Sequence, residues 1–168
     1  MKKVIIFGNS GSGKSTLAKQ MANKHQLAHL DLDTLAWQAT EPPSRKPLSE
    51  SKHAIALFCA KNNGWVIEGC YVDLLQVVAD QANEAVFMNL PVSLCQQNAK
   101  HRPWEPHKYS SKAEQDANLP MLLGWIEAYE TRLDEFSCQA HTQLYNEFSG
   151  TKQQITKNQT THNNKSES

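Results

Sequence analysis

The segment from Gly8 to Ser15 constrains the fold of this chain more than any other. It reads GNSGSGKS and matches the phosphate-binding pattern GxxxxGK[ST] at every fixed position. A short apolar run, Lys3 to Phe7, precedes it, and a segment with helical spacing of apolar residues follows it to about His25. A strand, a glycine-rich turn and a helix are the setting that this pattern requires. The sequence therefore predicts a phosphate-binding loop at the start of an α/β domain.

The residue types in this loop suit phosphate chemistry. Glycines let the backbone curl so that its N–H groups point inward, and the following helix N-terminus adds partial positive charge. We expect Lys14 to reach the β- and γ-phosphates of a nucleotide, and the Ser15 hydroxyl to bind Mg²⁺. The alternative is a glycine-rich turn without a ligand. The predicted nucleotide-binding residues are Gly8, Asn9, Ser10, Gly11, Ser12, Gly13, Lys14, Ser15 and Thr16.

Strand and helix patterns alternate along the rest of the chain. Further strands are predicted at 29–33, 65–67, 85–90 and 142–148, and further helices at 49–62, 71–83, 93–101, from Leu119 to Phe136, and at 151–156. The segment 38–47 holds three prolines and is predicted to be a loop. Alternation of this kind implies right-handed βαβ units, and so a parallel sheet with helices on both faces.

Composition limits the size and the setting of the domain. The 168 residues allow one domain at roughly 150 residues each. Lys plus Arg number 17, as do Asp plus Glu, which argues against a nucleic-acid or membrane partner. The four cysteines are scattered, as in reduced cytoplasmic proteins. We predict a domain at 1–156 and, because 157–168 has no apolar residue, a disordered tail there.

Carboxylates lie at the ends of two of the predicted strands. Asp31 and Asp33 alternate on one strand and so are expected on one face, beyond which ligands bind in open parallel sheets. Either could hold Mg²⁺ through water or take a proton from a hydroxyl, and the alternative is a solvated or helix-capping role. Glu68 ends an apolar strand and is expected near the metal or the acceptor, with Gly69 allowing close approach. The alternative is that Glu68 has only a structural role.

The chain has only three arginines, and each is a candidate for binding an anion. Arg102 follows the fourth strand–helix unit, where a lid is expected, and Arg132 could point back to the phosphates, so both are candidate catalytic residues beside Lys14 and Asp33. Arg45 could bind an acceptor's anion. Trp37 could form a wall of the acceptor pocket. The alternative for the arginines is a solvated surface position, and for the tryptophan it is core packing.

Three segments of the chain resemble a known group of proteins. GNSGSGKSTLAKQMA, HLDLDTLAW and WVIEGCY are similar to the corresponding segments of P-loop kinases of the nucleoside-monophosphate-kinase-like branch, which includes adenylate, shikimate and gluconate kinases. Within this branch the chain most resembles the adenylate-kinase-related proteins called DNA topology modulation proteins. The third segment has Glu68 where that group has Asp.

The resemblance implies a three-layer P-loop NTPase fold with a five-stranded parallel sheet in the order 2-3-1-4-5. It implies an acceptor-side flap at about 34–64 and a lid at about 101–118. It also implies that Gly8 to Thr16 bind ATP, that Ser15 and an acidic residue bind Mg²⁺, and that Asp33 faces the acceptor. Asp31 and Glu68 are the predicted metal-binding acids, and Asp33 is the alternative. The chain lacks the DGFPR segment of adenylate kinase and an arginine-rich lid, which argues against AMP as acceptor. It also lacks the glycine triplet of shikimate kinases.

The sequence thus predicts an ATP- and Mg²⁺-dependent kinase for an unidentified small hydroxyl or phosphate acceptor. The predicted acceptor-binding residues are Asp33, Trp37, Arg45, Glu68 and Gly69. We expect a cytoplasmic monomer or homodimer. The alternative is a nucleotide-binding regulator or weak NTPase without a small acceptor. A GTPase switch is disfavoured, because no guanine-reading NKxD motif is present.

Overall fold

A five-stranded parallel sheet forms the centre of the computed structural model, which describes residues 1–40 and 42–159. Its order is β2-β5-β1-β6-β7, and every neighbouring pair is parallel. A separate antiparallel hairpin holds β3 and β4, so the sheet strands numbered among themselves read 2-3-1-4-5. The sheet strands are β1 (Lys3–Gly8), β2 (Ala28–Asp31), β5 (Trp65–Gly69), β6 (Glu84–Met88) and β7 (Thr151–Ile155).

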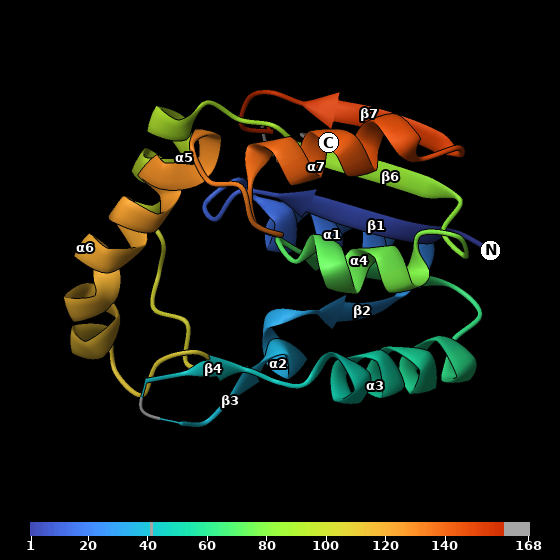
Figure 1. The fold of residues 1–168 in the computed structure, drawn as a ribbon, viewed down its shortest axis with the longest axis horizontal. Coiled ribbons are helices and arrows are strands. Elements are labelled where there is room, and N and C mark those ends of the chain that lie inside the picture. Colours follow the sequence, from blue (N-terminus) through green and yellow to red (C-terminus); the bar gives the residue numbers. More distant parts are fainter. Residues whose placement is uncertain (41, 160–168) are drawn as a thin grey trace, which may run out of the picture.

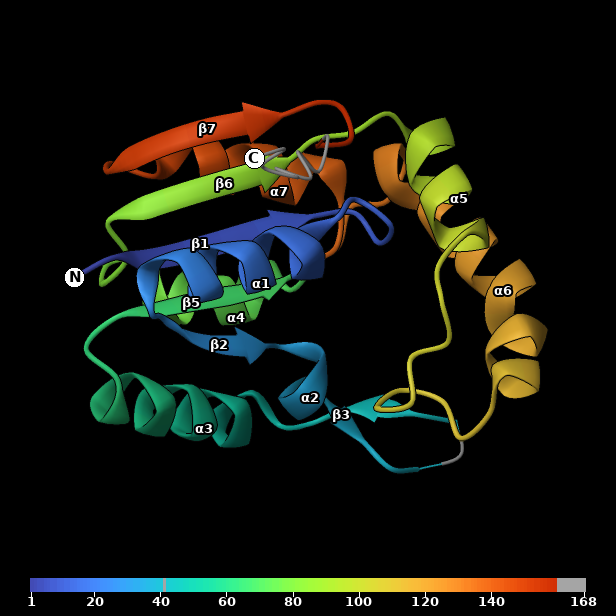
Figure 2. The same ribbon diagram turned by 180° about the vertical axis from the view of Figure 1, so that it is seen from behind.

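Helices cover both faces of this sheet, as expected for βαβ units (Figures 1 and 2). One apolar cluster joins the sheet to α1, α5 and α6, and the other joins it to α3, α4 and α7. The first set comprises α1 (Lys14–His25), α5 (Val92–Lys100) and α6 (Lys112–Glu127). The second set comprises α3 (Leu48–Lys61), α4 (Val72–Val78) and α7 (Cys138–Glu147).

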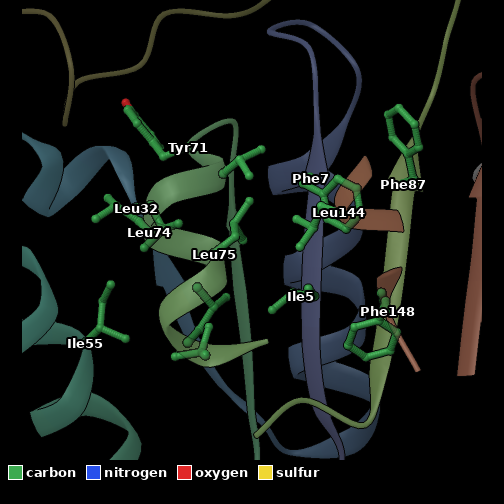
Figure 3. Close-up of a cluster of buried hydrophobic side chains, with 14 of the residues drawn as sticks. Ile5, Phe7, Leu32, Ile55, Tyr71, Leu74, Leu75, Phe87, Leu144 and Phe148 are labelled. Carbon is green, nitrogen blue, oxygen red and sulfur yellow. The ribbon is translucent and has the colours of Figure 1, made fainter. Parts of the chain in front are cut away.

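Strand β1 lies at the middle of both apolar clusters. Its side chains alternate, so that Ile5 and Phe7 face one cluster while Val4 and Ile6 face the other. All four are fully buried, which explains why this run is apolar at consecutive positions. Figure 3 shows Ile5 and Phe7 pointing among side chains of the cluster that joins the sheet to α3, α4 and α7. Burial on both faces fixes the strand that leads into the phosphate loop.

The C-terminal part of the chain corrects two sequence predictions. The segment 142–148 was predicted to be a strand, but it lies in and just after α7. Ser137 caps this helix by accepting a hydrogen bond from the amide of Ala140 at 3.0 Å. The segment 151–156 was predicted to be a helix, but it forms β7, which pairs with β6 at the edge of the sheet. Its side chains are mostly exposed, so its sequence carries little apolar signal.

The lid and the first part of the predicted flap, 34–47, stand beyond the carboxyl ends of the strands, whereas the rest of the flap is α3, which packs against the sheet (Figure 1). The flap holds α2 (Asp33–Ala36) and the hairpin β3 (Trp37–Gln38) and β4 (Ser44–Arg45). The prediction of a loop at 38–47 was therefore wrong at the hairpin strands. The lid is irregular from 101 to 111, between α5 and α6.

The helix predicted from Leu119 to Phe136 begins earlier and ends earlier than expected. It is α6, which begins at Lys112, where Ser111 accepts a hydrogen bond from the amide of Glu114 at 3.1 Å. The spacing of Ser111 and Glu114 is that of a capping box. The helix ends at Glu127, and a 3₁₀ turn, η1 (Ala128–Glu130), follows it.

The end of the chain is described only in part. Residues 160–168 of the predicted tail lie outside the described residues. Asn158 is described, and its side chain exchanges hydrogen bonds of 2.8 and 3.0 Å with the side chain of Asn98 in α5. In the described part of the chain, none of the helices has the length and apolar character needed to span a membrane.

Candidate functional site

The phosphate loop joins β1 to α1, and its shape depends on its glycines. Gly11 and Gly13 have φ angles of 77° and 88°, in the left-handed region that glycine adopts at little cost. A Cβ atom on Gly11 would lie 2.3 Å from the carbonyl oxygen of Cys95 in α5. The side chain of Asn98 donates a hydrogen bond to the carbonyl oxygen of Gly11 at 2.8 Å. The loop is therefore held in its curl by α5.

Polar groups of this loop are arranged to receive an anion. The ammonium of Lys14 lies across the loop, where it donates to the carbonyl oxygen of Asn9 at 2.7 Å. The hydroxyl of Ser12 is buried and has no hydrogen-bond partner among the described residues. Buried polar atoms without a partner are uncommon in folded proteins. A phosphate group on the loop would satisfy this hydroxyl and pair with the ammonium.

Ser15 and Glu68, two of the residues predicted to bind a metal, contact each other directly. The Ser15 hydroxyl donates a hydrogen bond to Oε1 of Glu68 at 2.9 Å. The Glu68 side chain is 2% exposed, and its Oε2 has no hydrogen-bond partner in the described chain, although Nε2 of His29 lies 3.5 Å away. The sheet register places Asp31 beside Glu68. A hydroxyl next to a buried carboxylate oxygen that lacks a partner fits the oxygen ligands that Mg²⁺ takes.

Asp31 and Asp33 come together in a different way from that predicted. They do not share a strand, because β2 ends at Asp31 and Asp33 begins α2. A carboxylate oxygen of Asp31 accepts a hydrogen bond from the amide of Asp33 at 2.9 Å, which turns the chain at this point. Burial raises the pKa of Asp31 to about 6, and repulsion by Asp33 and Glu68 adds to the effect.

Asp33 is held by two partners from distant parts of the chain. The hydroxyl of Tyr71, which follows β5, donates a hydrogen bond to Oδ1 of Asp33, and the ammonium of Lys108 in the lid lies 3.0 Å from its Oδ2. The hydroxyl of Tyr71 in turn accepts from the indole N–H of Trp37 at 2.7 Å. Burial would raise the pKa of Asp33, but Lys108 and Tyr71 outweigh it and hold the pKa below its usual value. Asp33 therefore stays ionised.

A cavity of about 580 Å³ brings the phosphate loop and the acceptor side together. The phosphate loop lines one side of it. Asp33, Glu68 and Gly69 line it from the ends of β2 and β5, and the lid contributes a further wall. The lid residues that line the cavity are His101, Arg102, Pro103, Glu105, His107 and Lys108.

The three arginines are all paired with carboxylates. Arg102 lines the cavity and pairs with Glu105, with 3.2 Å between Nη1 and Oε1. Arg132 pairs with Asp134 at 2.6 Å and lies over the ring of Trp125.

Arg45 pairs with Asp73 and Glu135, each at 3.1 Å, and lies over the ring of Tyr71. Neither Arg45 nor Arg132 is among the residues that line the cavity, and neither is Trp37, whose exposed fraction is 38%. The structure therefore brings Lys14, Asp33 and Arg102 to one cavity, without the other two arginines.

Sequence reasoning did not select Tyr71, Lys108 or Glu105 as site residues. The contact of Lys108 with Asp33 joins the lid to the flap, and no local spacing reports such a long-range pair. Tyr71 lies in the segment WVIEGCY, whose similarity to P-loop kinases was the one available signal. The described residues hold no group of three or more His, Cys, Asp and Glu side chains arranged for a metal. A magnesium ion here would therefore take most of its ligands from phosphates and water.

Comparison with known proteins gives two similarities at the level of sequence. No model of a known protein family matches the chain. An uncharacterized protein of Bacillus subtilis, YqaC, is 25% identical over 139 residues, which are 77% of this chain and 73% of that protein. The shikimate kinase of Enterococcus faecalis is 44% identical over 34 residues, which are 20% of each chain.

Comparison with solved structures shows the fold. A gluconokinase from Sinorhizobium meliloti matches with a TM-score of 0.54 at 16% identity, over 94% of this chain and 84% of that one. A shikimate kinase from Bacteroides thetaiotaomicron matches with a TM-score of 0.49 at 17% identity, over 84% and 82%. The phosphate loop, the parallel sheet and the likeness to the gluconokinase together show that this chain has the fold of the P-loop small-molecule kinases.

Proposed function

We propose that the protein is an ATP- and Mg²⁺-dependent phosphotransferase that transfers the γ-phosphoryl group of ATP to a small-molecule acceptor. The observation that carries this proposal is that Asp33 lines the same cavity as the phosphate loop. Phosphoryl transfer requires mainly that donor and acceptor be positioned together and that the developing charge be stabilised. A phosphate loop opposite an ionised carboxylate meets the first requirement, and Lys14 meets the second.

In this proposal each residue has a defined task. Asp33 orients an acceptor hydroxyl and takes its proton. The acceptor oxygen then bonds to the γ-phosphorus while the bond from that phosphorus to the β–γ bridging oxygen breaks, and ADP leaves. Lys14 pairs with the phosphate oxygens throughout. Mg²⁺, held with the nucleotide by Ser15 and with Glu68 and Asp31 beside it, would supply further positive charge at the phosphates.

The test measures nucleotide binding and transfer separately. Mg-ATP at 100 times its dissociation constant should stabilise the fold by about 2.7 kcal/mol and so raise the melting temperature. ADP formation should then rise when the correct acceptor is added, which a screen of small hydroxyl compounds and phosphate compounds would reveal. An unchanged melting curve at millimolar Mg-ATP would remove the nucleotide-binding part of the proposal.

The competing function is a nucleotide-binding regulator or weak NTPase. It predicts a rise in melting temperature with Mg-ATP but no acceptor that stimulates ADP formation. The cavity favours the kinase, because it extends from the phosphate loop to Asp33 and the lid. A protein that only hydrolysed or sensed ATP would need no cavity beyond the nucleotide-binding part.

The proposal includes parts that the resemblance supplied. The segments 34–64 and 101–118 are proposed to close over the acceptor and the nucleotide, and 1–156 is proposed to be the kinase domain. Similarity to the DNA topology modulation proteins rests on the three quoted segments. We propose a cytoplasmic location from the scattered cysteines, and no nucleic-acid or membrane partner from the equal numbers of basic and acidic residues. A monomer or homodimer is proposed with it.

A further inference from the structure

The carboxylates around the lid and Asp33, which are Asp31, Asp33 and Glu105, outnumber the cations there. Two cationic side chains of the lid line this part of the cavity, and both lie beside carboxylates. Arg102 pairs with Glu105 at 3.2 Å. Lys108 lies 3.0 Å from a carboxylate oxygen of Asp33 and 3.4 Å from one of Glu105, and Asp31 lies 4.0 Å away on its other side.

The other two arginines are paired outside the cavity. Arg45 lies between Asp73 and Glu135, and Arg132 pairs with its neighbour Asp134. Lys14 and Lys19 line the cavity from the phosphate loop and from α1, where a nucleotide would use their charge. A carboxylate or phosphate on a ligand is usually bound by a guanidinium that can donate two parallel hydrogen bonds. Each arginine of this chain already lies within ion-pair distance of a carboxylate.

We propose that the acceptor is a hydroxyl compound that carries no carboxylate or phosphate group, such as a neutral polyol, sugar or nucleoside. This inference rests on the kinase function proposed above. An anionic acceptor would enter beside Asp33, Glu105 and Asp31 and would have to break their pairs with Lys108 or Arg102. Like charges placed together at a binding site repel each other and weaken binding.

The same side chains are well suited to hydroxyl groups. The carboxylates of Asp33 and Glu105 accept hydrogen bonds from hydroxyls, and the ammonium of Lys108 donates to them. His101 and His107 add two more polar groups on the lid wall. A neutral polyhydroxylated molecule can join this network while every ion pair stays in place. An acid cannot do so.

The experiment sorts possible acceptors by charge before any of them is identified. A small-molecule filtrate of a cell extract is passed over an anion exchanger, which gives a retained anionic fraction and a flow-through of neutral and cationic compounds. Each fraction is incubated with the full chain, Mg²⁺ and ATP labelled at the γ-phosphate. Label that moves to a new small-molecule product is measured. Matched pairs that share a skeleton, sorbitol with gluconate and adenosine with AMP, are assayed alongside.

We expect that at least ten times more label is transferred to compounds of the flow-through than to compounds of the retained fraction. Equal or greater transfer in the retained fraction overturns the inference and leaves the kinase function standing. Transfer in neither fraction, while Mg-ATP raises the melting temperature, overturns the kinase function itself, and the inference falls with it. The two failures are therefore distinguishable.

A variant tests whether charge pairing is the cause of the preference. Glu105→Gln releases Arg102 and Lys108 from one carboxylate, and transfer in the retained fraction should rise several-fold relative to the flow-through. Glu130→Gln is the matched control, because Glu130 is exposed and forms no ion pair within the described chain. An unchanged ratio in Glu105→Gln contradicts the electrostatic explanation.

Discussion

The ammonium of Lys108 lies 3.0 Å from a carboxylate oxygen of Asp33, so the lid touches the acceptor side of the cavity directly. The two residues come from opposite sides of the site, one from the irregular segment after α5 and the other from the first turn of α2. Burial opposes the charge on Lys108, yet Asp33 and Asp31 outweigh it and raise its pKa above the usual lysine value. Both groups are therefore charged when they meet.

Replacing this lysine should loosen the lid. Lys108→Met removes the pairs with Asp33 and Glu105, and we expect the amides of residues 101–111 to exchange with deuterium several-fold faster. Lys112→Met is the control, because Lys112 pairs only with Asp116 one turn away on the surface of α6. Equal exchange rates in the two variants would show that the ion pair does not hold the lid.

Replacing the acceptor-side carboxylate should affect transfer more than nucleotide binding. Asp33→Asn keeps the size of the side chain but removes the base and its charge, so acceptor-dependent turnover should fall by about 10²–10⁴-fold. The dissociation constant for Mg-ATP should change little, because Asp33 lies outside the phosphate loop. The exposed Asp80 gives the control, Asp80→Asn. If Asp33→Asn instead abolishes Mg-dependent ATP binding, this acid serves the metal and its role as acceptor base is wrong.

Removing the loop lysine should abolish transfer without unfolding the protein. Lys14→Ala removes the ammonium that would meet charge developing on the phosphates, and loss of one such contact costs about 10²–10³-fold in rate. The melting temperature without nucleotide should stay close to that of the unaltered protein. Lys24→Ala, on the exposed end of the same helix, is the comparison. Full turnover in Lys14→Ala is the result that would refute the site assignment.

Gly11 should tolerate no side chain, whereas Gly124 should. Gly11→Ala places a Cβ atom 2.3 Å from the carbonyl oxygen of Cys95 at a φ of 77°, so it should lower the melting temperature and weaken Mg-ATP binding. Gly124 lies inside α6 with no atom within 4 Å of such a Cβ, and Gly124→Ala should stabilise the fold by about 0.5–1 kcal/mol. Thermal melts with and without Mg-ATP would separate the two cases. Equal melting temperatures would contradict the close packing of the loop against α5.

His141 should make the fold less stable in mild acid. Its ring is fully buried, with Nδ1 2.6 Å from the hydroxyl of Tyr129 and Nε2 2.8 Å from the carbonyl oxygen of Cys70. Burial lowers the pKa of His141 to about 4. The unfolded chain binds a proton below about pH 6.5, whereas the folded chain does so only near pH 4. The free energy of unfolding therefore falls as the pH drops through this window.

The size of this effect is on the order of 3 kcal/mol between pH 7 and pH 4. His141→Gln keeps a donor for the Cys70 carbonyl and an acceptor for Tyr129 but does not titrate. Denaturant unfolding at several pH values should give a shallower dependence for the variant than for the unaltered protein. Parallel curves would mean that other groups cause the acid sensitivity.

Most of the fold could be predicted from the sequence because the phosphate loop fixes the first βαβ unit and the buried strands are apolar. The end of the chain could not be predicted. Strand β7 owes its place to backbone hydrogen bonds with β6 and buries little of its polar sequence, so periodicity says nothing about it. Helix α7 did carry a signal, since His141, Leu144 and Phe148 are spaced for one helical face and are buried there.

The site divides in the same way. The loop residues are adjacent in sequence, and their roles follow from one motif. The partners of Asp33 are distant from it in sequence. Tyr71 and Lys108 reach it from two other parts of the chain, and only the tertiary fold brings them there. Arg45 shows the same limit for a predicted anion-binding residue. A loop arginine suggests an anion site, but the acids that pair with it come from α4 and from the segment before α7.

The packing of Gly11 against Cys95 has a practical consequence for altering this protein. Helix α5 packs against the phosphate loop and ends at Lys100, just before the lid begins. The helix is therefore structurally coupled to the phosphate loop, and the irregular segment after it is not. Residues 101–110 begin where α5 ends and stop before the cap of α6 at Ser111. We therefore expect that residues 101–110 can be replaced by the corresponding segment of another protein of this fold without disturbing the phosphate loop, whereas a graft that included α5 would alter the loop and the lid together.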